Sequence, residues 1–234
     1  MCGRYRLARN IYELMEFFGV EESDLNWEPH YNIAPTQDVV TVCQHSKEPR
    51  RALSLMRWGL IPYWARDISV GGKAINAVSE TVAEKPTFRE AIRRRRCLIP
   101  ADGFYEWKKL SAKEKQPYNS GMQDNAIFAM AGVWERWKDP SGKHLESCSV
   151  LTTSANALLQ DIHHRMPVIL KPEDYDRWLD PGITDPNQMA DLLQPLDARL
   201  MRTYPVSTRV NSVKNDDPSC AEPVIISHTA SLFG

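Results

Sequence analysis

The sequence predicts an α+β fold in which mainly antiparallel strands form a barrel-like core flanked by several short helices. The middle of the chain carries successive strand-like segments separated by turn residues: Cys97–Ile99, Gly103–Lys108, Pro117–Ser120, Ala126–Glu135 and Ser147–Thr153. Because helices do not alternate regularly with these strands, a parallel βαβ sheet is not favoured. Many short strands in succession can close into a barrel. No low-complexity linker or internal repeat divides residues 1–234, which indicates a single domain.

The first elements have recognisable boundaries. Gly3–Leu7 is a candidate strand. Asn10, with Glu13 three residues later, is typical of a helix N-cap, and Gly19 is typical of a helix end. Two further segments are predicted to be strands: Val39–Gln44 and Leu53–Trp58.

Short helices are predicted around and after the central strands. One pair covers Ser79–Glu84 and Thr87–Arg95, interrupted at Pro86 because proline lacks the N–H that a helix interior needs. Ser154 is expected to cap a helix with inward-facing apolar side chains, namely Ala155, Leu158, Leu159 and Ile162. The last predicted elements are two helices and a strand: Glu173–Leu179, Asn187–Leu193 and Met201–Ser207.

Composition narrows the class of protein. The 29 basic residues nearly balance the 30 acidic ones, so the net charge of −1 gives no bulk support for nucleic-acid binding, and any such site must be a local patch. No apolar run approaches the roughly 20 residues that a membrane span needs, and charged residues occupy the place of a signal peptide. We therefore expect a cytoplasmic protein without a membrane partner.

The five cysteines indicate a reduced protein. Their number is odd and no CxxC pair occurs, which argues against a disulfide framework and against a zinc knuckle. We expect no metal and no other cofactor. Four of the thiols have no evident chemical role and are predicted to be packing residues: Cys43, Cys97, Cys148 and Cys220.

Cys2 carries the strongest chemical signal. A small residue after Met1 normally lets an aminopeptidase remove Met1, so the mature chain would begin with a free α-amine and a thiol two carbons apart. This pair can condense with an aldehyde, first as a Schiff base and then as a five-membered thiazolidine. Alternatively, the thiol can attack an acyl carbon while the amine serves as base. The ordinary alternative is a small buried residue without a reactive role.

Three other residues are candidates for chemistry, each with an ordinary alternative. Glu106 lies between Tyr105 and Trp107, and an apolar surrounding would raise the pKa of its carboxyl and suit it to general acid–base work. Alternation on a strand could instead point Glu106 to solvent. Asn76 follows apolar residues and would need buried partners if it points inward, or it is a turn residue.

His163 and His164 follow a predicted helix end. Adjacent side chains cannot both face the same way, so a shared metal is not expected. We expect one of the two at a site and the other at the surface; a capping or surface role is the alternative to catalysis.

Basic and aromatic residues give weaker signals for nucleic acid. The run Arg93–Arg96 could follow phosphates, but it ends a predicted helix, where cations suit the helix dipole, and a solvated face is expected. Trp58, Tyr63 and Trp64 could stack on bases, although core packing is the commoner role of such side chains.

Taken together, the ordered motifs of this chain resemble those of the SRAP family, the SOS response-associated peptidase-like proteins. The resemblance spans essentially the full chain. The motifs that carry it are Cys2-Gly3-Arg4, Tyr31-Asn32-Ile33-Ala34-Pro35, Trp58-Gly59-Leu60, Ile75-Asn76-Ala77, Asp102-Gly103-Phe104-Tyr105-Glu106-Trp107 and Ile162-His163.

The resemblance implies a compact barrel-like domain that senses abasic sites in single-stranded DNA during the DNA damage response. Cys2 would link covalently to the ring-opened sugar aldehyde as a thiazolidine and shield the lesion from strand cleavage. Glu106 would move protons, His163 would hydrogen-bond the opened sugar hydroxyl, and Asn76 would orient Cys2. The partner would be abasic DNA, bound by a monomer that associates with the nucleoid.

The DNA contacts carry over less completely. Arg4, Thr152 and Arg165 occupy matching positions, and Trp107 is a further expected DNA-binding residue. Val78 stands where the family pattern often has arginine, and Pro86 replaces a further basic position. Fewer neutralised phosphates should lower the salt dependence of binding.

Two other classes of function stay open from the sequence. One is a cysteine peptidase of the N-terminal nucleophile type with self-processing activity, such as removal of Met1, with Cys2 attacking and His163 or the α-amine as base. The other is a non-enzymatic single-strand DNA-binding module in which Cys2 is incidental. Replacement of Cys2 separates the binding module from the other two classes, because only the binding module would be indifferent to it.

Overall fold

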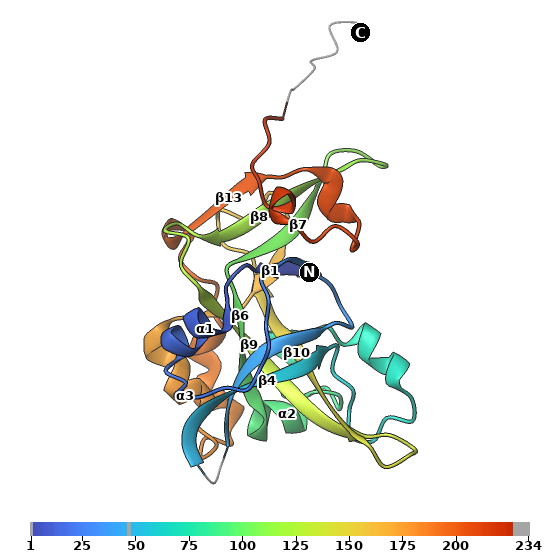
Figure 1. The fold of residues 1–234 in the computed structure, drawn as a ribbon, viewed down its shortest axis with the longest axis vertical. Coiled ribbons are helices and arrows are strands. Elements are labelled where there is room, and N and C mark those ends of the chain that lie inside the picture. The colour runs from blue at the N-terminus through green and yellow to red at the C-terminus, as the bar shows by residue number, and fades with distance from the viewer. Residues whose placement is uncertain (1, 46–47, 227–234) are drawn as a thin grey trace, which may run out of the picture.

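Two β-sheets lie one above the other along the long axis of the molecule, and the first strand lies where they meet (Figure 1). The computed structural model describes residues 2–45 and 48–226. Within this part of the chain, the larger sheet contains eight strands and the smaller sheet five. The strands of the larger sheet are β3 (Asp38–His45), β4 (Glu48–Trp58), β5 (Asn76–Val78), β6 (Arg96–Ala101), β9 (Phe128–Lys138), β10 (His144–Ser154), β11 (Arg165–Pro167) and β12 (Ile169–Leu170).

Five strands of the larger sheet close into a barrel. They pair in the cyclic order β10-β4-β3-β6-β9 and back to β10. Every pairing in this ring is antiparallel except β4 with β10, where Cys148 lies opposite Trp58 in a parallel ladder. Closure satisfies the backbone groups that an open sheet edge would leave unpaired. The predicted barrel-like, mainly antiparallel core is therefore confirmed.

The smaller sheet brings the amino-terminal strand beside the central motif. Its order is β13-β8-β7-β1-β2, and all its pairings are antiparallel. The strands are β1 (Arg4–Leu7), β2 (His30–Ile33), β7 (Gly103–Lys109), β8 (Lys115–Met122) and β13 (Met201–Pro205). In the β1–β7 ladder Arg4 lies opposite Tyr105. This register places the start of the chain next to the end of β7.

The helices are short and lie outside the barrel. They are α1 (Ile11–Phe18), α2 (Arg89–Arg94) and α3 (Tyr175–Leu179), with 3-10 helices at Ile68–Lys73, Ser79–Thr81, Pro172–Asp174, Pro186–Leu193, Ala198–Leu200, Thr208–Asn211 and Pro218–Cys220. The predicted caps of α1 are confirmed. Asn10 accepts from the N–H of Glu13, whose side chain accepts from the N–H of Asn10, and Gly19 ends the helix in the left-handed conformation.

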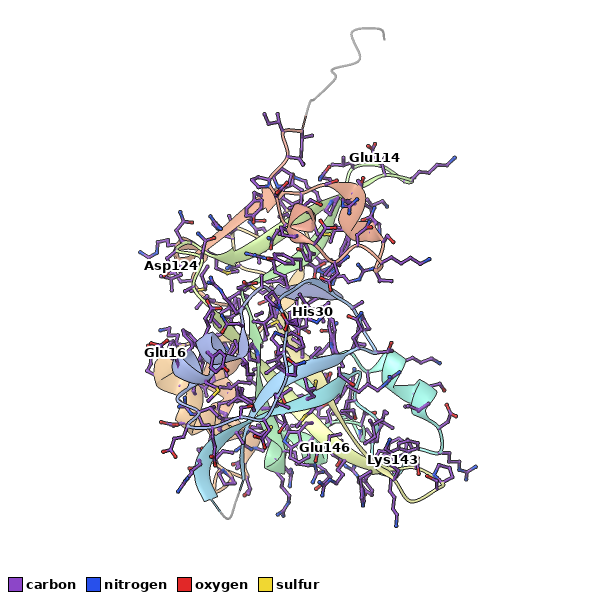
Figure 2. All side chains as sticks on the ribbon, in the orientation of Figure 1. Glu16, His30, Glu114, Asp124, Lys143 and Glu146 are labelled. Carbon is purple, nitrogen blue, oxygen red and sulfur yellow. The ribbon has the colours of Figure 1, made fainter. Side chains whose placement is uncertain are left out.

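One continuous hydrophobic cluster fills the barrel and extends to the first strands of the smaller sheet. Gly132 permits close packing inside it, because a Cβ there would lie 2.7 Å from the sulfur of Cys97. The four cysteines predicted to be packing residues are all buried. Charged side chains such as Glu16, Asp124 and Lys143 point outward from the periphery (Figure 2).

Two predicted helices are different in the structure. No helix follows Ser154, which ends β10; consecutive turns follow it, and Asn156 instead accepts from the N–H groups of Leu158 and Leu159. The apolar residues of this segment still pack on the core, so their inward direction was right and the helix was wrong. The segment predicted as Ser79–Glu84 forms only a 3-10 turn at Ser79–Thr81.

The expectation of a solvated Arg93–Arg96 run is wrong for Arg96. Its side chain is buried and donates hydrogen bonds to the carbonyls of Ile92 and Arg93 at the end of α2, and to those of Trp178 and Asp180 at the end of α3. One guanidinium thus satisfies the carbonyl ends of two helices. The physical reason is the packing of α3 against β6, which the local sequence does not indicate.

Candidate functional site

Cys2 lies buried just ahead of β1, held by a contact to its main chain. The amide nitrogen of Asn76 donates to the carbonyl oxygen of Cys2 at 2.8 Å. Asn76 begins β5, which pairs in parallel with β10, so a barrel-associated strand holds the start of the chain. Burial raises the pKa of the Cys2 thiol, and the nearby charge of Glu106 adds to the rise. The thiol is therefore protonated at neutral pH.

Glu106 is buried on β7 and points away from solvent. Its side chain is 4% exposed, which excludes the solvent-facing alternative. Arg4 pairs with Tyr105, so Glu106 lies one position beyond that pair, toward Cys2. Burial raises the pKa of the Glu106 carboxyl to about 7, against the opposing effect of the positive charge at the amino terminus of the chain. A carboxyl with this pKa can both give and take a proton at neutral pH.

His163 lies in the loop between β10 and β11. Nδ1 of His163 faces the backbone of Arg165, 3.0 Å from its N–H and 3.2 Å from its carbonyl oxygen, which leaves Nε2 as the other ring nitrogen. Burial lowers the pKa of His163, and the charge of the amino terminus lowers it further. The neighbouring ring of His164 stacks on it, with centroids 4.4 Å apart. The expectation that adjacent histidines diverge is therefore wrong, although His164 is the more exposed of the two.

The four predicted catalytic residues share one neighbourhood. Asn76 contacts Cys2 directly, Glu106 acts electrostatically on the Cys2 thiol, and the terminal charge acts on Cys2, Glu106 and His163. They come from β5, β7, the start of the chain and the loop before β11, four segments far apart in sequence. The set combines a thiol, a buried carboxyl, an imidazole and an amide that holds the main chain of Cys2.

Two residues predicted to bind DNA contact one another through a carboxy-terminal segment. Arg4 donates to the side chain of Asn32 at 2.8 Å and to the carbonyl of Val210 at 2.8 Å. The guanidinium of Arg4 also lies 6.0 Å from the centre of the Trp107 ring. The indole N–H of Trp107 donates to Asn211 at 2.7 Å, which orients the ring. Arg4 thus has structural partners of its own.

The other two predicted DNA-binding residues lie on paired strands. Ser154 of β10 pairs with Arg165 of β11, and the side chain of Arg165 donates to the carbonyl of Thr152 at 2.7 Å. The Thr152 side chain is buried, and within the described residues its hydroxyl has no hydrogen-bond partner. Arg165 also forms a two-bond ion pair with Glu80, with both N···O distances 2.7 Å.

The three aromatic residues considered for base stacking divide between core and surface, and the residue that departs from the family pattern is half-buried. Trp58 is buried in the barrel and donates to the carbonyl of Ile75. Tyr63 and Trp64 are 59% and 52% exposed, so core packing does not describe them. Val78 ends β5 opposite Thr152 and is half-buried. The position where the resemblance predicts arginine is thus occupied by a short apolar side chain.

Sequence reasoning missed three residues that build the surroundings of the site. Asp102 is buried and accepts from the N–H of Ala8 at 3.2 Å, which fixes the end of β1. Asn211 holds Trp107, and Glu80 holds Arg165. Glu80 lies close in sequence to the predicted site residue Asn76, and this closeness could have identified it. Asn211 lies in a distant segment with no sequence feature that points to the site.

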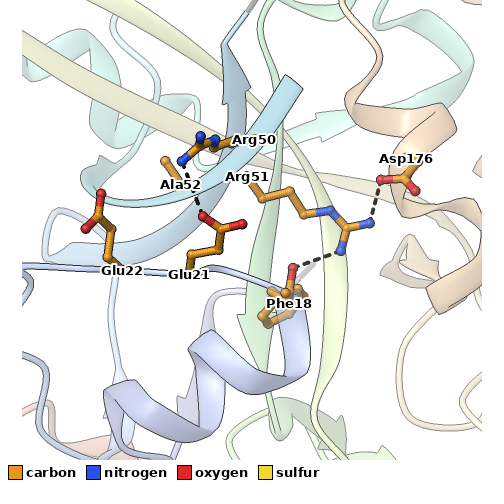
Figure 3. A pocket seen from close by; sticks show the side chains of 8 residues that line it. Phe18, Glu21, Glu22, Arg50, Arg51, Ala52 and Asp176 are labelled. Carbon is orange, nitrogen blue, oxygen red and sulfur yellow. Dashed lines mark hydrogen bonds and ion pairs between the residues drawn. The ribbon is translucent and has the colours of Figure 1, made fainter. Parts of the chain in front are cut away.

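A separate charged cavity of about 410 Å³ contains none of the predicted site residues (Figure 3). Its two arginines are already paired: Arg50 with Glu21 at 3.2 Å, and Arg51 with Asp176 at 2.6 Å. Within the described residues, no three His, Cys, Asp or Glu side chains gather closely enough to hold a metal ion, and no helix there is long and apolar enough to cross a membrane.

Known proteins resemble this chain in sequence and in fold. The family model described as SOS response associated peptidase (SRAP) matches residues 1–213. The chain is 44% identical over 224 residues to the abasic site processing protein YoqW of Bacillus subtilis (strain 168), covering 95% of this chain and 99% of that protein. It is 34% identical over 203 residues to the abasic site processing protein HMCES of Rattus norvegicus, covering 74% and 57%.

A crystal structure of a Bacteroides thetaiotaomicron protein superposes with a TM-score of 0.86 at 28% identity, covering 96% of this chain and all of that one. The family model matches most of the chain, and the curated relatives agree over nearly the same span. The chain therefore belongs to the SRAP family.

Proposed function

We propose that this protein processes abasic sites in single-stranded DNA by forming a covalent cross-link through Cys2 after removal of Met1. The thiazolidine would protect the lesion from strand cleavage. Curated relatives bear the name abasic site processing protein, which supports the substrate. The observation that carries the proposal is the bond from Asn76 to the main chain of Cys2 beside the buried carboxyl of Glu106.

The proposed reaction needs proton transfer at each step. An abasic deoxyribose is mostly a closed hemiacetal, so O1′ must lose a proton and O4′ must gain one to release the aldehyde. The amine of Cys2 adds to C1′, water leaves, and an imine forms. The sulfur then bonds to C1′ while the thiol proton moves to nitrogen. The net reaction joins aldehyde, amine and thiol and releases one water.

Glu106 is suited to these transfers because its pKa of about 7 lets both protonation states be present at neutral pH. His163, with its pKa lowered by burial, would be neutral and would hydrogen-bond the opened sugar hydroxyl. Fast capture by sulfur matters because a long-lived imine acidifies C2′ and permits β-elimination, which breaks the strand.

A peptidase of the N-terminal nucleophile type receives less support. Burial keeps the Cys2 thiol protonated, so no preformed thiolate is available. Nδ1 of His163 is held by the backbone of Arg165, so a role as base would fall to Nε2 of that ring. The α-amine remains as a possible base, so the two activities are separated by experiment.

The test is denaturing gel electrophoresis after mixing Met1-processed protein with a single-stranded oligonucleotide that carries one abasic site. We expect a band that survives heat and detergent. It should be absent with an unmodified oligonucleotide and with Cys2→Ala. Cys2→Ser keeps the amine but cannot close the sulfur ring, so it should lose the stable band while retaining DNA binding.

An uncleaved amino-terminal tag provides a second control, because it removes the free Cys2 amine. A normal cross-link from such a protein, or from Cys2→Ala, would contradict the mechanism. No cross-link from protein whose Met1 removal is verified by mass spectrometry would favour the peptidase or the binding module. DNA binding unaffected by Cys2→Ala would then identify the binding module.

A further inference from the structure

Glu80 occupies the hydrogen-bonding fork of Arg165. Its two carboxylate oxygens accept from Nη1 and Nη2 of Arg165, each at 2.7 Å. The Glu80 side chain is 53% exposed and that of Arg165 is 15% exposed, so the carboxylate lies on the solvent side of the guanidinium. The pair lowers the pKa of Glu80 to about 2, so the carboxylate is charged at any physiological pH.

Outside the pair with Glu80, Arg165 offers no second two-bond fork to an anion. Nη2 also donates to the carbonyl of Thr152 at 2.7 Å, which uses both of its protons. Nε is buried and has no hydrogen-bond partner within the described residues. A phosphate can therefore receive the two parallel bonds that an arginine fork offers only if the carboxylate of Glu80 leaves.

The pair lies beside the reactive centre. Glu80 is two residues past β5, the strand whose Asn76 holds Cys2. The backbone N–H of Arg165 donates to His163. A DNA strand whose sugar is bound at Cys2 must bring its flanking phosphates into this neighbourhood, because each sugar carries a phosphate on both sides.

We infer that Glu80 is an internal competitor for the DNA backbone, which holds the fork of Arg165 until a phosphate displaces it. This inference rests on the proposed function, since it takes DNA as the ligand of the site. Glu80 is a positioning residue: it keeps Arg165 extended toward the site and reduces the affinity for phosphates in general. When DNA binds, Arg165 exchanges the carboxylate of Glu80 for a phosphate, so its net contribution to the free energy of DNA binding is small.

The exchange has a consequence for salt dependence. When Arg165 neutralises a phosphate, the phosphate releases a counterion, but the displaced carboxylate of Glu80 gains one. The contact then adds little to the salt slope. With Glu80 neutral, the same contact should steepen the slope by about 0.7 for single-stranded DNA.

The experiment measures binding of an unmodified single-stranded oligonucleotide by fluorescence anisotropy at several salt concentrations. This DNA has no aldehyde, so the readout does not depend on Cys2 chemistry. Glu80→Gln should bind about five- to tenfold more tightly and with the steeper slope. Glu84→Gln is the matched control, because Glu84 is an exposed acidic residue four positions on; its effect should be twofold or less.

The double variant Glu80→Gln with Arg165→Gln identifies the cause. If Glu80 acts through Arg165, its replacement should give a twofold gain or less once Arg165 is absent. An equal gain in both backgrounds would mean general repulsion and would overturn the inference. So would unchanged or weaker binding by Glu80→Gln, with Glu80→Ala giving the same result and thermal unfolding showing both variants folded.

Cross-linking of abasic DNA by the wild-type protein runs in parallel. Its absence, with the anisotropy results as expected, would reject the proposed function while leaving competition at Arg165 standing. Its presence, with anisotropy unaffected by Glu80, would reject the competitor role alone.

Discussion

Asp102 and Glu106 lie four residues apart in one motif. They are 3% and 4% exposed, and burial raises the pKa of both carboxyls. The charges that oppose the rise differ. Asp102 lies 3.6 Å from Arg6 and 3.5 Å from Arg9. For Glu106 the opposing charge belongs to the amino terminus of the chain.

The difference separates a structural carboxylate from a reactive one. A guanidinium is charged at every accessible pH, so it keeps Asp102 in one electrostatic state. The amine at the start of this chain belongs to Met1. After the proposed removal of Met1, the α-amine would be that of Cys2, which titrates near pH ~8 and is consumed as it forms an imine. The environment of Glu106 therefore changes during the reaction, which suits a group that must both give and take protons.

The largest effect should come from Glu106→Gln, which keeps the shape of the side chain and removes its proton transfer. We expect the rate of cross-linking to fall by about 10³-fold, equivalent to about 4 kcal/mol, with DNA binding retained. Single-turnover cross-linking on denaturing gels measures it. Glu135→Gln is the matched control, because Glu135 is equally buried but paired with Arg95 on the barrel. A normal rate for Glu106→Gln would remove its acid–base role.

Asp102→Asn should act on stability and not on chemistry. The change leaves Arg6 and Arg9 beside a neutral buried amide and weakens the anchor at the end of β1. We expect the free energy of unfolding to fall by only about 1 kcal/mol, because burial disfavours the charged carboxyl and both arginines are partly exposed. Urea unfolding measures it. The cross-linking rate of the folded fraction should stay within a few-fold of wild type, and a 10³-fold loss would erase the distinction between the two carboxylates.

The pH dependence of stability tests the state of Glu106. Its folded pKa of about 7 lies above the unfolded value near ~4.5, so the unfolded state binds fewer protons in this window. Stability should therefore fall as pH rises from about 4.5 to 7, by roughly 3 kcal/mol relative to Glu106→Gln. Parallel urea titrations of both proteins measure the difference. If the free energy of unfolding of the two proteins changes equally with pH, the pKa of Glu106 lies near its ordinary value.

The smallest effect concerns Glu80, a third carboxylate with the opposite shift. Its pKa of about 2 means that its pairing with Arg165 stabilises the fold above pH ~4.5 and is lost as pH falls toward 2. Because Glu80 is half exposed, Glu80→Gln should cost at most about 1 kcal/mol at neutral pH. Thermal unfolding measures it, and a larger loss would make the pair a structural element.

Local patterns predicted most of the elements. The strands of the central region and the caps Asn10 and Gly19 depend on residues close in sequence, and they are found within a few positions of their expected limits. Errors arose where distant contacts decide. The local sequence predicts that Arg96 is solvated, but the packing of α3 buries it. The segment after Ser154 has the apolar spacing of a helix but forms turns.

The site was predictable in its residue types and not in its assembly. Motifs and the family resemblance identified Cys2, Asn76, Glu106 and His163, and each carries a recognisable chemical capability. The sequence could not show Glu80 in the fork of Arg165, because that contact requires β10 and β11 to pair beside the end of β5.

The sequence by itself determined the strand-rich order of the chain, the helix caps and a thiol on the residue that follows Met1, since these depend on neighbouring atoms or on covalent structure. Only the tertiary structure decided that the barrel closes through a parallel β4–β10 contact and that Glu106 is buried beside Cys2. It also decided that Arg6 and Arg9 lie beside Asp102 and not beside Glu106. Burial and charge separation depend on which distant segments meet, and a pKa depends on both.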